Sequence, residues 1–260
     1  MPVKNLFERI SAVLILIILS PVFVILAAII AIQFREFPFF LQERGLTLEK
    51  NRFRIIKFKT IRAGKIKNGE RKKIKDIFYK EDFKSGLSGF SGWLRRTGLD
   101  ELPQIINVIK GEMSFIGPRP LMIDDLELMA GDFGFYYSLR NGLKCNPGIT
   151  CLWQLLGKRE KGIADLIELD LIYDNMRSVK MNMKIVIVTI PYIIFAYNSD
   201  SIIRGRRSVP GNLISAETRR KIRKRVVAFL AYSKTEEKVR KQMQQYGSGL
   251  QFSGRSFMKQ

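Results

Sequence analysis

An uncharged apolar run near the N-terminus constrains this chain more than any other feature of its sequence. From Ile10 to Ile32 the residues read ISAVLILIILSPVFVILAAIIAI, and a helix of that length would extend about 34 Å at 1.5 Å per residue. This is enough to cross the hydrocarbon core of a bilayer. It also exceeds the apolar region of about 7–15 residues in a secretory signal peptide. The sequence therefore predicts a membrane-embedded helix.

Pro21 lies near the middle of this run and leaves two topologies open. It cannot donate to the carbonyl of Ile17, so the helix should kink there, and the Ser20 hydroxyl can bond back to the freed backbone. The flanks are basic, with Arg9 before the run and Arg35 after it. If both ends prefer the cytoplasmic face, a re-entrant helix satisfies the positive-inside tendency better than a crossing. A kinked transmembrane helix agrees with these physical arguments about equally well.

The charge and the absence of histidine limit the function classes. A formal net charge of +21 over 260 residues attracts nucleic acid, anionic lipid head groups or phosphorylated substrates. The chain has no histidine, which excludes a Ser/His/Asp triad and removes the commonest general base and the usual zinc ligand. Cys145 and Cys151 have no metal-ligand company in the sequence, and we expect two reduced, packed thiols on the cytosolic side.

The pattern after the apolar run predicts a mainly helical α+β fold. Residues 37–62 alternate in a way that predicts a short strand or a β-hairpin, with Gly45 in the turn. Apolar residues at helical spacing from Leu99 to Ile109 predict a helix that Gly111 closes. Helices are also expected over 124–139 and 163–175, and the Gly/Pro turn in CNPGIT should lead into a strand-like run.

Three domains are expected from these elements: residues 1–35 as the membrane helix, 36–210 as a small globular catalytic domain with amphipathic interfacial helices, and 211–260 as a basic extension. The extension has helical apolar spacing among many Lys and Arg residues. Such a helix lies on anionic lipid.

Asp100 and Glu101 are the candidates for chemistry. Adjacent helical residues point about 100° apart, so they cannot share a proton as facing carboxylates do. One could attack while the other holds a metal, since a carboxylate is a nucleophile at neutral pH without a base. Arg95, one turn earlier, and Arg119, between two prolines, could grip the phosphates of a substrate, and a Mg²⁺ ion would complete the clamp.

Each of these residues also has an ordinary structural interpretation. Carboxylates at a helix N-terminus are favoured by the helix dipole, and for the pair alone this is the commoner case. Arg119 could be a surface charge, and Lys57 and Lys59 the solvated face of a strand. The functional interpretation depends on their occurrence together beside a membrane segment.

The stretch LDELPQIINVIKGEMSFIGPRPL, residues 99–121, closely resembles the bacterial sugar transferase family, the small monotopic polyprenyl-phosphate phosphoglycosyl transferases. The resemblance continues in SPVFVILAAIIA, FFLQERG and FRIIKFKTIR upstream, and in NPGIT, LWQLLGK, LDLIYDN and KIVIVTI downstream. The motifs keep the order of the family over residues 5–195, a combination far more specific than one Asp-Glu pair.

The resemblance implies roles for individual residues. Asp100 matches the nucleophile of the family, and Glu101 matches its Mg²⁺ ligand. Phosphate-binding positions are matched by a set of basic residues: Lys57, Lys59, Arg95 and Arg119. The pair Ser20-Pro21 matches the motif that breaks the membrane helix of the family, which favours the re-entrant topology.

The implied activity is transfer of a sugar-1-phosphate from a UDP-sugar to polyprenyl (undecaprenyl) phosphate, with release of UMP. Such a step begins bacterial glycoconjugate assembly at the cytoplasmic face of the inner membrane, so anionic lipids are expected partners and nucleic acid is not. The basic extension lies outside the resemblance; we expect it to provide membrane adhesion or a homo-oligomer contact.

Three positions depart from the pattern of the family. Lys59 replaces an arginine, which loses bidentate geometry but keeps the charge; Cys151 replaces a glycine, and Asn182 an aspartate. None touches the Asp-Glu pair, so a change of nucleotide or sugar preference is the expected consequence.

Two other function classes compete with the enzyme. A membrane-anchored nucleic-acid-binding protein would use the sequence pI of about 10.1, but the chain lacks aromatic-basic RNA motifs and a recognition-helix pattern. A membrane scaffold would depend on residues 211–260. Asp100→Asn separates the enzyme from the nucleic-acid-binding protein, because only the enzyme needs this carboxylate. Deletion of residues 211–260 separates the enzyme from the scaffold, because the scaffold would lose its role and the enzyme should keep at least some turnover.

Overall fold

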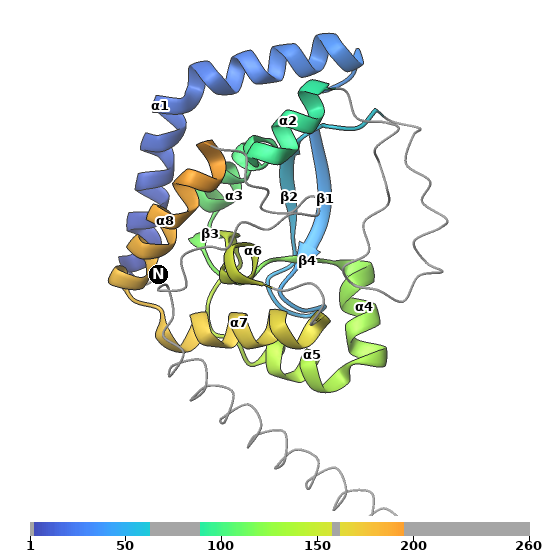
Figure 1. The fold of residues 1–260 in the computed structure, drawn as a ribbon, viewed down its shortest axis with the longest axis vertical. Coiled ribbons are helices and arrows are strands. Elements are labelled where there is room, and N and C mark those ends of the chain that lie inside the picture. Colours follow the sequence, from blue (N-terminus) through green and yellow to red (C-terminus); the bar gives the residue numbers. More distant parts are fainter. Residues whose placement is uncertain (1–2, 63–88, 158–161, 195–260) are drawn as a thin grey trace, which may run out of the picture. The chain divides into compact units, whose positions relative to one another are not determined.

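The computed structural model describes residues 3–62, 89–157 and 162–194 (Figure 1). The fold is α+β and mainly helical, with one long apolar N-terminal helix, as the sequence predicts; its strands form two small sheets, where the sequence predicted a single hairpin. In chain order the elements are α1 (Val3–Phe34), β1 (Phe39–Gly45), β2 (Phe53–Phe58), α2 (Gly89–Thr97), the 3₁₀-helix η3 (Leu99–Gln104), α3 (Ile105–Lys110), β3 (Ser114–Ile116), β4 (Leu121–Met122), α4 (Ile123–Asp132), α5 (Gly134–Asn141), β5 (Gly148–Thr150), α6 (Leu152–Leu156), α7 (Gly162–Met176) and α8 (Val179–Ile194).

The chain separates into two compact units, Met1–Leu213 and Ile214–Gln260. The second unit, with most of the basic extension predicted from the sequence, lies outside the described residues.

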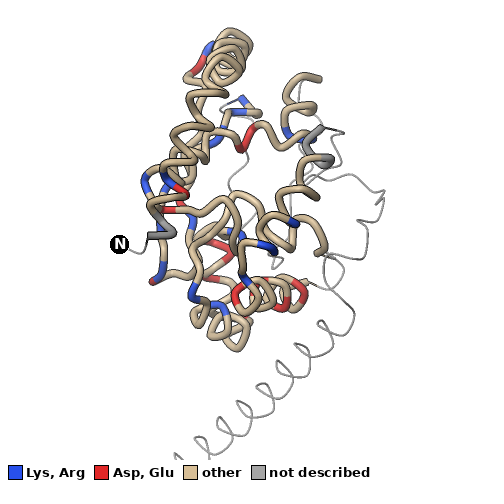
Figure 2. Tube along the Cα trace, turned by 90° about the vertical axis from the view of Figure 1, so that its left-hand side faces the viewer, with Lys and Arg blue, Asp and Glu red and all other residues tan. Residues whose placement is uncertain are grey.

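The helix α1 bends sharply part-way along its length, so that two arms run in different directions (Figure 1). Pro21 lies inside the helix, and Ser20 Oγ donates to the carbonyl oxygen of Ile17 at 2.8 Å, the bond expected beside a proline. Within the described ranges, the segment Leu6–Phe34 is the one helix long and apolar enough to cross a membrane. Figure 2 shows charged residues at the two ends of α1 and none along its middle.

Both arms of α1 pack against the strand β2. Ala12 of the first arm lies in a core cluster with Phe53 and Ile55, at the start of the strand. Leu26, Ile30 and Phe34 of the second arm lie in another cluster with Phe58, at the end of the same strand. The rest of α1 exposes large apolar side chains, among them Leu14, Ile17, Ile18, Val22, Val24, Ile25, Ile29 and Ile32.

The predicted hairpin is present: β1 and β2 are antiparallel, with Phe39 opposite Phe58 and Arg44 opposite Phe53. The strand order of the larger sheet is β2-β1-β4, and a second sheet pairs β3 and β5 in parallel. Gly45 was expected in the hairpin turn but is the last residue of β1. A Cβ at this position would lie 2.6 Å from the carbonyl oxygen of Thr47, so the close approach of the backbone explains the glycine.

The helix predictions were right in kind and partly wrong in extent. Gly111 closes the predicted helix in the left-handed conformation, but the first six residues form the 3₁₀-helix η3. The helix expected over 124–139 is two helices, because the backbone leaves the helical region at Phe133 (φ −132°, ψ 39°). The strand-like run after CNPGIT is wrong: β5 ends at Thr150 and α6 follows. The helix predicted over 163–175 is confirmed as α7.

Cys145 and Cys151 are both free and buried, which confirms packed, reduced thiols. Burial raises the pKa of the Cys145 thiol, which is therefore protonated at neutral pH. The Cys151 sulfur accepts from the backbone N–H of Gln154 at 3.3 Å and caps the N-terminus of α6. The cysteine at this position thus begins a helix.

Candidate active site

Asp100 and Glu101 lie in the first turn of η3, where acidic side chains suit the helix N-terminus. Gly98 precedes the turn in the left-handed conformation, with φ 72°, and ends α2 just before it. Since a 3₁₀-helix has about three residues per turn, the two carboxylates point about 120° apart and take different surroundings. The Glu101 carboxylate is buried, whereas Asp100 is half-buried.

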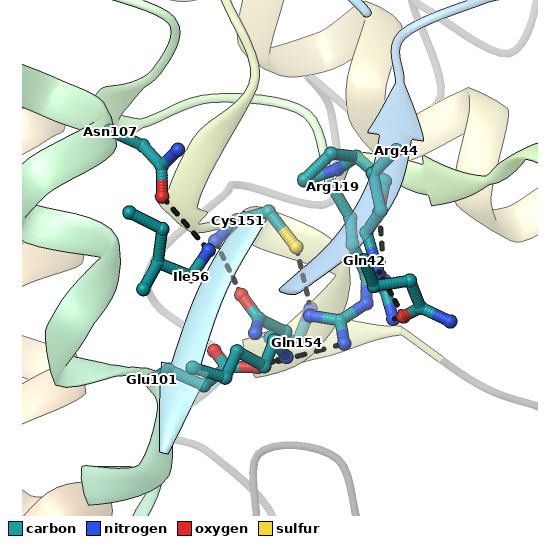
Figure 3. Close-up of polar contacts among 10 residues, drawn as sticks. Gln42, Arg44, Ile56, Glu101, Asn107, Arg119, Cys151 and Gln154 are labelled. Carbon is teal, nitrogen blue, oxygen red and sulfur yellow. Dashed lines mark hydrogen bonds and ion pairs between the residues drawn. The ribbon is translucent and has the colours of Figure 1, made fainter. Parts of the chain in front are cut away.

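Two cations approach one oxygen of Glu101. Lys57 Nζ lies 2.5 Å from Glu101 Oε1 and Arg119 Nη2 lies 3.9 Å from the same atom. The three side chains retain 11–14% of their exposure, so the charges are poorly screened and interact more strongly than at an open surface. Figure 3 shows the Arg119 guanidinium reaching Glu101 from the neighbouring loop. The structure thus brings together three of the residues that the sequence singled out.

Asn107 explains how Lys57 of β2 meets Glu101 of η3. The Asn107 side chain is fully buried, and its Nδ2 donates to the carbonyl of Arg54 at 2.8 Å. Its Oδ1 accepts from the N–H of Ile56 at 3.1 Å (Figure 3). It therefore satisfies backbone groups of β2 and fixes that strand against the helix that follows η3. Sequence reasoning missed this residue, whose only signal is a polar side chain on the apolar face of a predicted helix.

Arg119 lies in a loop, Gly117–Pro120, that joins β3 of one sheet to β4 of the other. The loop is held at both ends: the N–H of Gly148 donates to the carbonyl of Pro118 at 2.9 Å, and Arg44 Nη1 donates to the carbonyl of Pro120 at 3.1 Å. Arg44 is oriented in turn by Gln42, whose Oε1 accepts from its Nε and Nη2 (Figure 3). The prolines fix φ on either side of Arg119, so its side chain leaves a rigid backbone.

The other two predicted phosphate-binding residues lie in different surroundings. Lys59 Nζ pairs with Glu36 at 2.8 Å, next to the end of α1, and Arg62 lies 4.0 Å from the other oxygen of that carboxylate. Arg95 is half-buried in the last turn of α2, one turn before η3. Both remain candidates for phosphate binding, and the carboxylate that Lys59 pairs with is Glu36, not Glu101.

Gln104 is a second polar residue that sequence reasoning missed. It lies three residues after Glu101, and side chains three apart eclipse one another in a 3₁₀-helix. It is buried, and its Nε2 finds no hydrogen-bond partner within the part of the chain that the structure describes. The Gln104 amide is therefore a hydrogen-bond donor that a bound substrate could use near Glu101.

The carboxylates of η3 agree with a Mg²⁺ site that a substrate completes. No group of three Asp, Glu, His or Cys residues capable of holding a metal occurs among the described residues, so these residues alone build no metal cage. Mg²⁺ is commonly held by one or two carboxylates plus substrate phosphates and water. Glu101 and the adjacent Asp100 carry hard carboxylate oxygens, the type of atom that such an ion takes as ligands.

Comparison with known proteins assigns the chain to a family. Residues 1–196 match the family described as bacterial sugar transferase. The chain belongs to the bacterial sugar transferase family. This transferase is 31% identical to the exopolysaccharide production protein ExoY of Sinorhizobium fredii over 214 residues, which cover 75% of this chain and 87% of that protein.

Two other relatives carry names that state a reaction. The undecaprenyl-phosphate glucose phosphotransferase of Komagataeibacter xylinus is 28% identical over 204 residues, 75% of this chain and 36% of that protein. The undecaprenyl-phosphate galactose phosphotransferase of Salmonella typhimurium is 41% identical over 86 residues, 33% of this chain and 16% of that protein. The match therefore spans most of ExoY but about a third or less of the two phosphotransferases.

Proposed function

We propose that this transferase moves a sugar-1-phosphate from a UDP-sugar to undecaprenyl phosphate, giving undecaprenyl-diphosphate-sugar and UMP for polysaccharide or other glycoconjugate synthesis. The names of the relatives support the acceptor and the class of product. The observation that carries the proposal is the η3 carboxylate pair set against Lys57 and Arg119 beside a membrane helix.

The reaction proceeds in two displacements at one phosphorus atom. A carboxylate oxygen of Asp100 attacks the phosphorus that carries the sugar; the bond to the bridging oxygen breaks, and UMP leaves with that oxygen. The product is a phosphosugar ester of Asp100. A phosphate oxygen of undecaprenyl phosphate then attacks the same phosphorus, and the Asp100 carboxylate is released with both electrons of its bond.

Asp100 and Glu101 lie in different surroundings and are proposed to have different roles. Asp100 is half-buried and can meet the soluble nucleotide, whereas the buried Glu101 is oriented by Lys57 and Arg119. The same cations offset the negative charge of an incoming diphosphate, which would otherwise repel a carboxylate nucleophile. Arg119 could do so with two parallel hydrogen bonds. Lys59 and Arg95 are proposed to bind more distant phosphate or lipid charges.

Glu101, with Asp100 adjacent, would hold Mg²⁺ together with the substrate diphosphate. When bound, the ion supplies charge neutralisation on the phosphate oxygens. The residues of the chain do the rest: Asp100 provides the attacking oxygen, Arg119 and Lys57 orient the phosphates, and the rigid Gly117–Pro120 loop fixes the position of the guanidinium.

A re-entrant membrane helix is proposed for α1. Ala12 and Leu26–Phe34, on the two sides of Pro21, pack at opposite ends of β2, a strand of about 17 Å. A helix that crosses the bilayer can touch a domain on one side near one end only. Contacts from both arms therefore support a helix that enters and returns, with its exposed apolar bend in lipid.

With the positive-inside tendency of its basic flanks, this topology is proposed to keep the catalytic unit at the cytoplasmic face of the bacterial inner membrane. There the site can reach both a soluble UDP-sugar and the phosphate of a buried lipid. The exposed apolar stripe of α8, which includes Val179, Met183, Val186, Ile187 and Ile190, suits an interfacial helix. The basic residues 211–260 are proposed to bind anionic lipid or to form a homo-oligomer contact.

The covalent step is tested with purified protein, a UDP-sugar panel and no lipid acceptor. We expect release of about one UMP per protein and a phosphosugar adduct on Asp100 by mass spectrometry. Asp100→Asn should give neither, while Asp124→Asn, which changes an aspartate of α4, should behave as the unmodified protein. An enzyme that turns over with both substrates but never carries an adduct would exclude the covalent route.

The metal is tested separately. Turnover should fall on addition of EDTA and return with Mg²⁺. Full turnover in EDTA would refute the metal assignment without touching the role of Asp100.

A further inference from the structure

A buried arginine of α5 holds the backbone of Arg119. Arg140 is fully buried, and its Nη2 donates to the carbonyl oxygen of Arg119 itself. Its Nε donates to the carbonyl of Leu46 at 2.6 Å, and its Nη1 pairs with Asp170 Oδ2 of α7 at 2.5 Å. One guanidinium group thus joins the segment just after β1, the α7 helix and the loop of the candidate site.

The helix α7 makes a second contact with the same segment. Tyr173, one turn after Asp170, donates its hydroxyl to the carbonyl of Ile116 at 2.9 Å. With the bonds to Pro118 and Pro120 already described, the carbonyls on both sides of Arg119 and that of Arg119 itself are all fixed. Three of these four partners are side chains of residues distant in sequence, Arg44, Arg140 and Tyr173.

Stability alone explains the buried pair poorly. Removing two charges from water costs several kcal/mol per ion, and apolar residues of similar volume are often at least as stable. A lysine could also neutralise Asp170, but it could not direct donors at three acceptors in a fixed planar arrangement. The geometry therefore favours a role in orientation.

We propose that the Arg140–Asp170 ion pair positions the Arg119 guanidinium relative to Glu101. The assignment of phosphate binding to Arg119 rests on the proposed function, but the ordering of the loop does not. Because a misplacement of 1 Å in a site can cost about 100-fold in rate, a loosened loop should be visible in turnover although Arg140 touches no substrate.

The test uses full-length Arg140→Lys in lipid nanodiscs, with Arg52→Lys as the matched control. Arg52 also binds a carboxylate through two nitrogens, at 3.0 and 2.6 Å to Glu43, but on the exposed side of the hairpin. Hydrogen-deuterium exchange is measured over residues 114–122. We expect faster exchange there in Arg140→Lys and no change in Arg52→Lys; unchanged exchange in Arg140→Lys would overturn the inference.

Turnover with a UDP-sugar and undecaprenyl phosphate provides the second measurement. Arg140→Lys should lower kcat/KM about 10- to 100-fold. In an Arg119→Lys background the same change should cost less than about threefold, because the group it positions is gone. An equal loss in both backgrounds would mean that Arg140 acts only through general stability, and would refute the positioning role.

Asp170→Asn provides a second variant should Arg140→Lys not fold, and it should show the same two effects. If the unmodified protein releases no UMP with any UDP-sugar, the proposed function fails. The exchange measurement then still decides whether the pair orders the loop.

Discussion

Lys57 and Lys59 are two residues apart, yet their ammonium groups meet different carboxylates. Lys57 is 2.5 Å from Glu101 in the candidate site, and Lys59 is 2.8 Å from Glu36 at the end of α1. Their types and spacing alone cannot distinguish them, since the difference arises from packing of β2 against η3. The structure thus separates two residues that the sequence treats alike.

Lys57→Met should reduce kcat/KM about 100-fold, because it removes a charge that acts on the phosphate and on Glu101 in a poorly screened site. Lys59→Met is the matched control and should lose less than about tenfold, since Lys59 pairs with Glu36 outside the carboxylate pair. Both effects are measured from UMP release over a range of UDP-sugar concentrations. Equal losses in the two variants would show that the pairing with Glu101 does not define the phosphate site.

The pKa of Asp170 predicts that the stability of the folded protein depends on pH. Burial raises its pKa from 3.8 to about 6, although Arg140 opposes the shift. The folded protein therefore binds this proton more readily than the unfolded chain, and the contribution of Asp170 to stability is largest below about pH 4 and is lost as pH rises through about 6. Relative to Asp170→Asn, the unmodified protein should gain unfolding free energy between about pH 7 and about pH 4.

Denaturant unfolding in nanodiscs at several pH values measures this difference. A difference between the two proteins that stays constant with pH would contradict the raised pKa of Asp170.

At the scale of elements, Arg9 of α1 is hydrogen-bonded to the C-terminal end of α3. Its Nη2 donates to the carbonyl of Lys110 at 2.6 Å, and it lies over Gly111, which has φ +80°. A Cβ at Gly111 would lie 1.9 Å from Arg9 Nη2. Only glycine combines this conformation with room for the arginine.

Gly111→Ala should therefore lower the unfolding free energy by at least about 1 kcal/mol, from the left-handed conformation alone. Displacement of Arg9 should add to this. Gly131→Ala is the control: Gly131 lies in α4, and a Cβ added there would meet no heavy atom within 4 Å, so this change should stabilise by about 0.5–1 kcal/mol. Denaturant unfolding measures both variants, and a Gly111→Ala protein as stable as the unmodified one would refute the fastening of α1 by Arg9.

Pro21 gives a prediction for the topology of α1. With the proline in place, a cysteine at Asn5 should react with a membrane-impermeant thiol reagent from the cytoplasmic side only. Pro21→Leu restores the missing N–H, straightens the helix, and should expose part of the population to the opposite side. Val22→Leu is the neighbouring control and should behave as the unmodified helix.

The two native cysteines are buried, so background labelling should be low. Labelling of the unmodified helix from the periplasmic side alone would refute the re-entrant topology.

The elements that the sequence predicted well are those with strong local signals. The apolar run, the alternating hairpin residues and the helically spaced apolar residues of α7 each follow from a pattern of hydrophobicity. Phe133 shows the limit, because nothing in its apolar side chain marks the break between α4 and α5.

Asn107 and Arg140 were missed because Asn107 pairs with Ile56, 51 residues away, and Arg140 with Asp170, 30 residues away. Local patterns do not encode such pairings.

At the scale of the whole molecule, two means of membrane attachment are proposed, an apolar helix and a basic extension. Deletion of residues 211–260 should leave some turnover, because the described site lies within the first unit. Binding to vesicles with anionic lipid should become weaker and less sensitive to salt. The measurements are vesicle sedimentation at increasing salt and UMP release; complete loss of turnover in a folded deletion protein would contradict this division.

The packing of both α1 arms onto β2 also bears on how such enzymes can be rebuilt. Ala12, Leu26, Ile30 and Phe34 are at once part of the membrane helix and part of the two clusters around the strand. The helix is therefore not an interchangeable anchor, and a chimera with a generic transmembrane segment would lose side chains from both clusters. Chimeras of two related proteins should fold only when α1 and the β1–β2 hairpin are exchanged together as one unit.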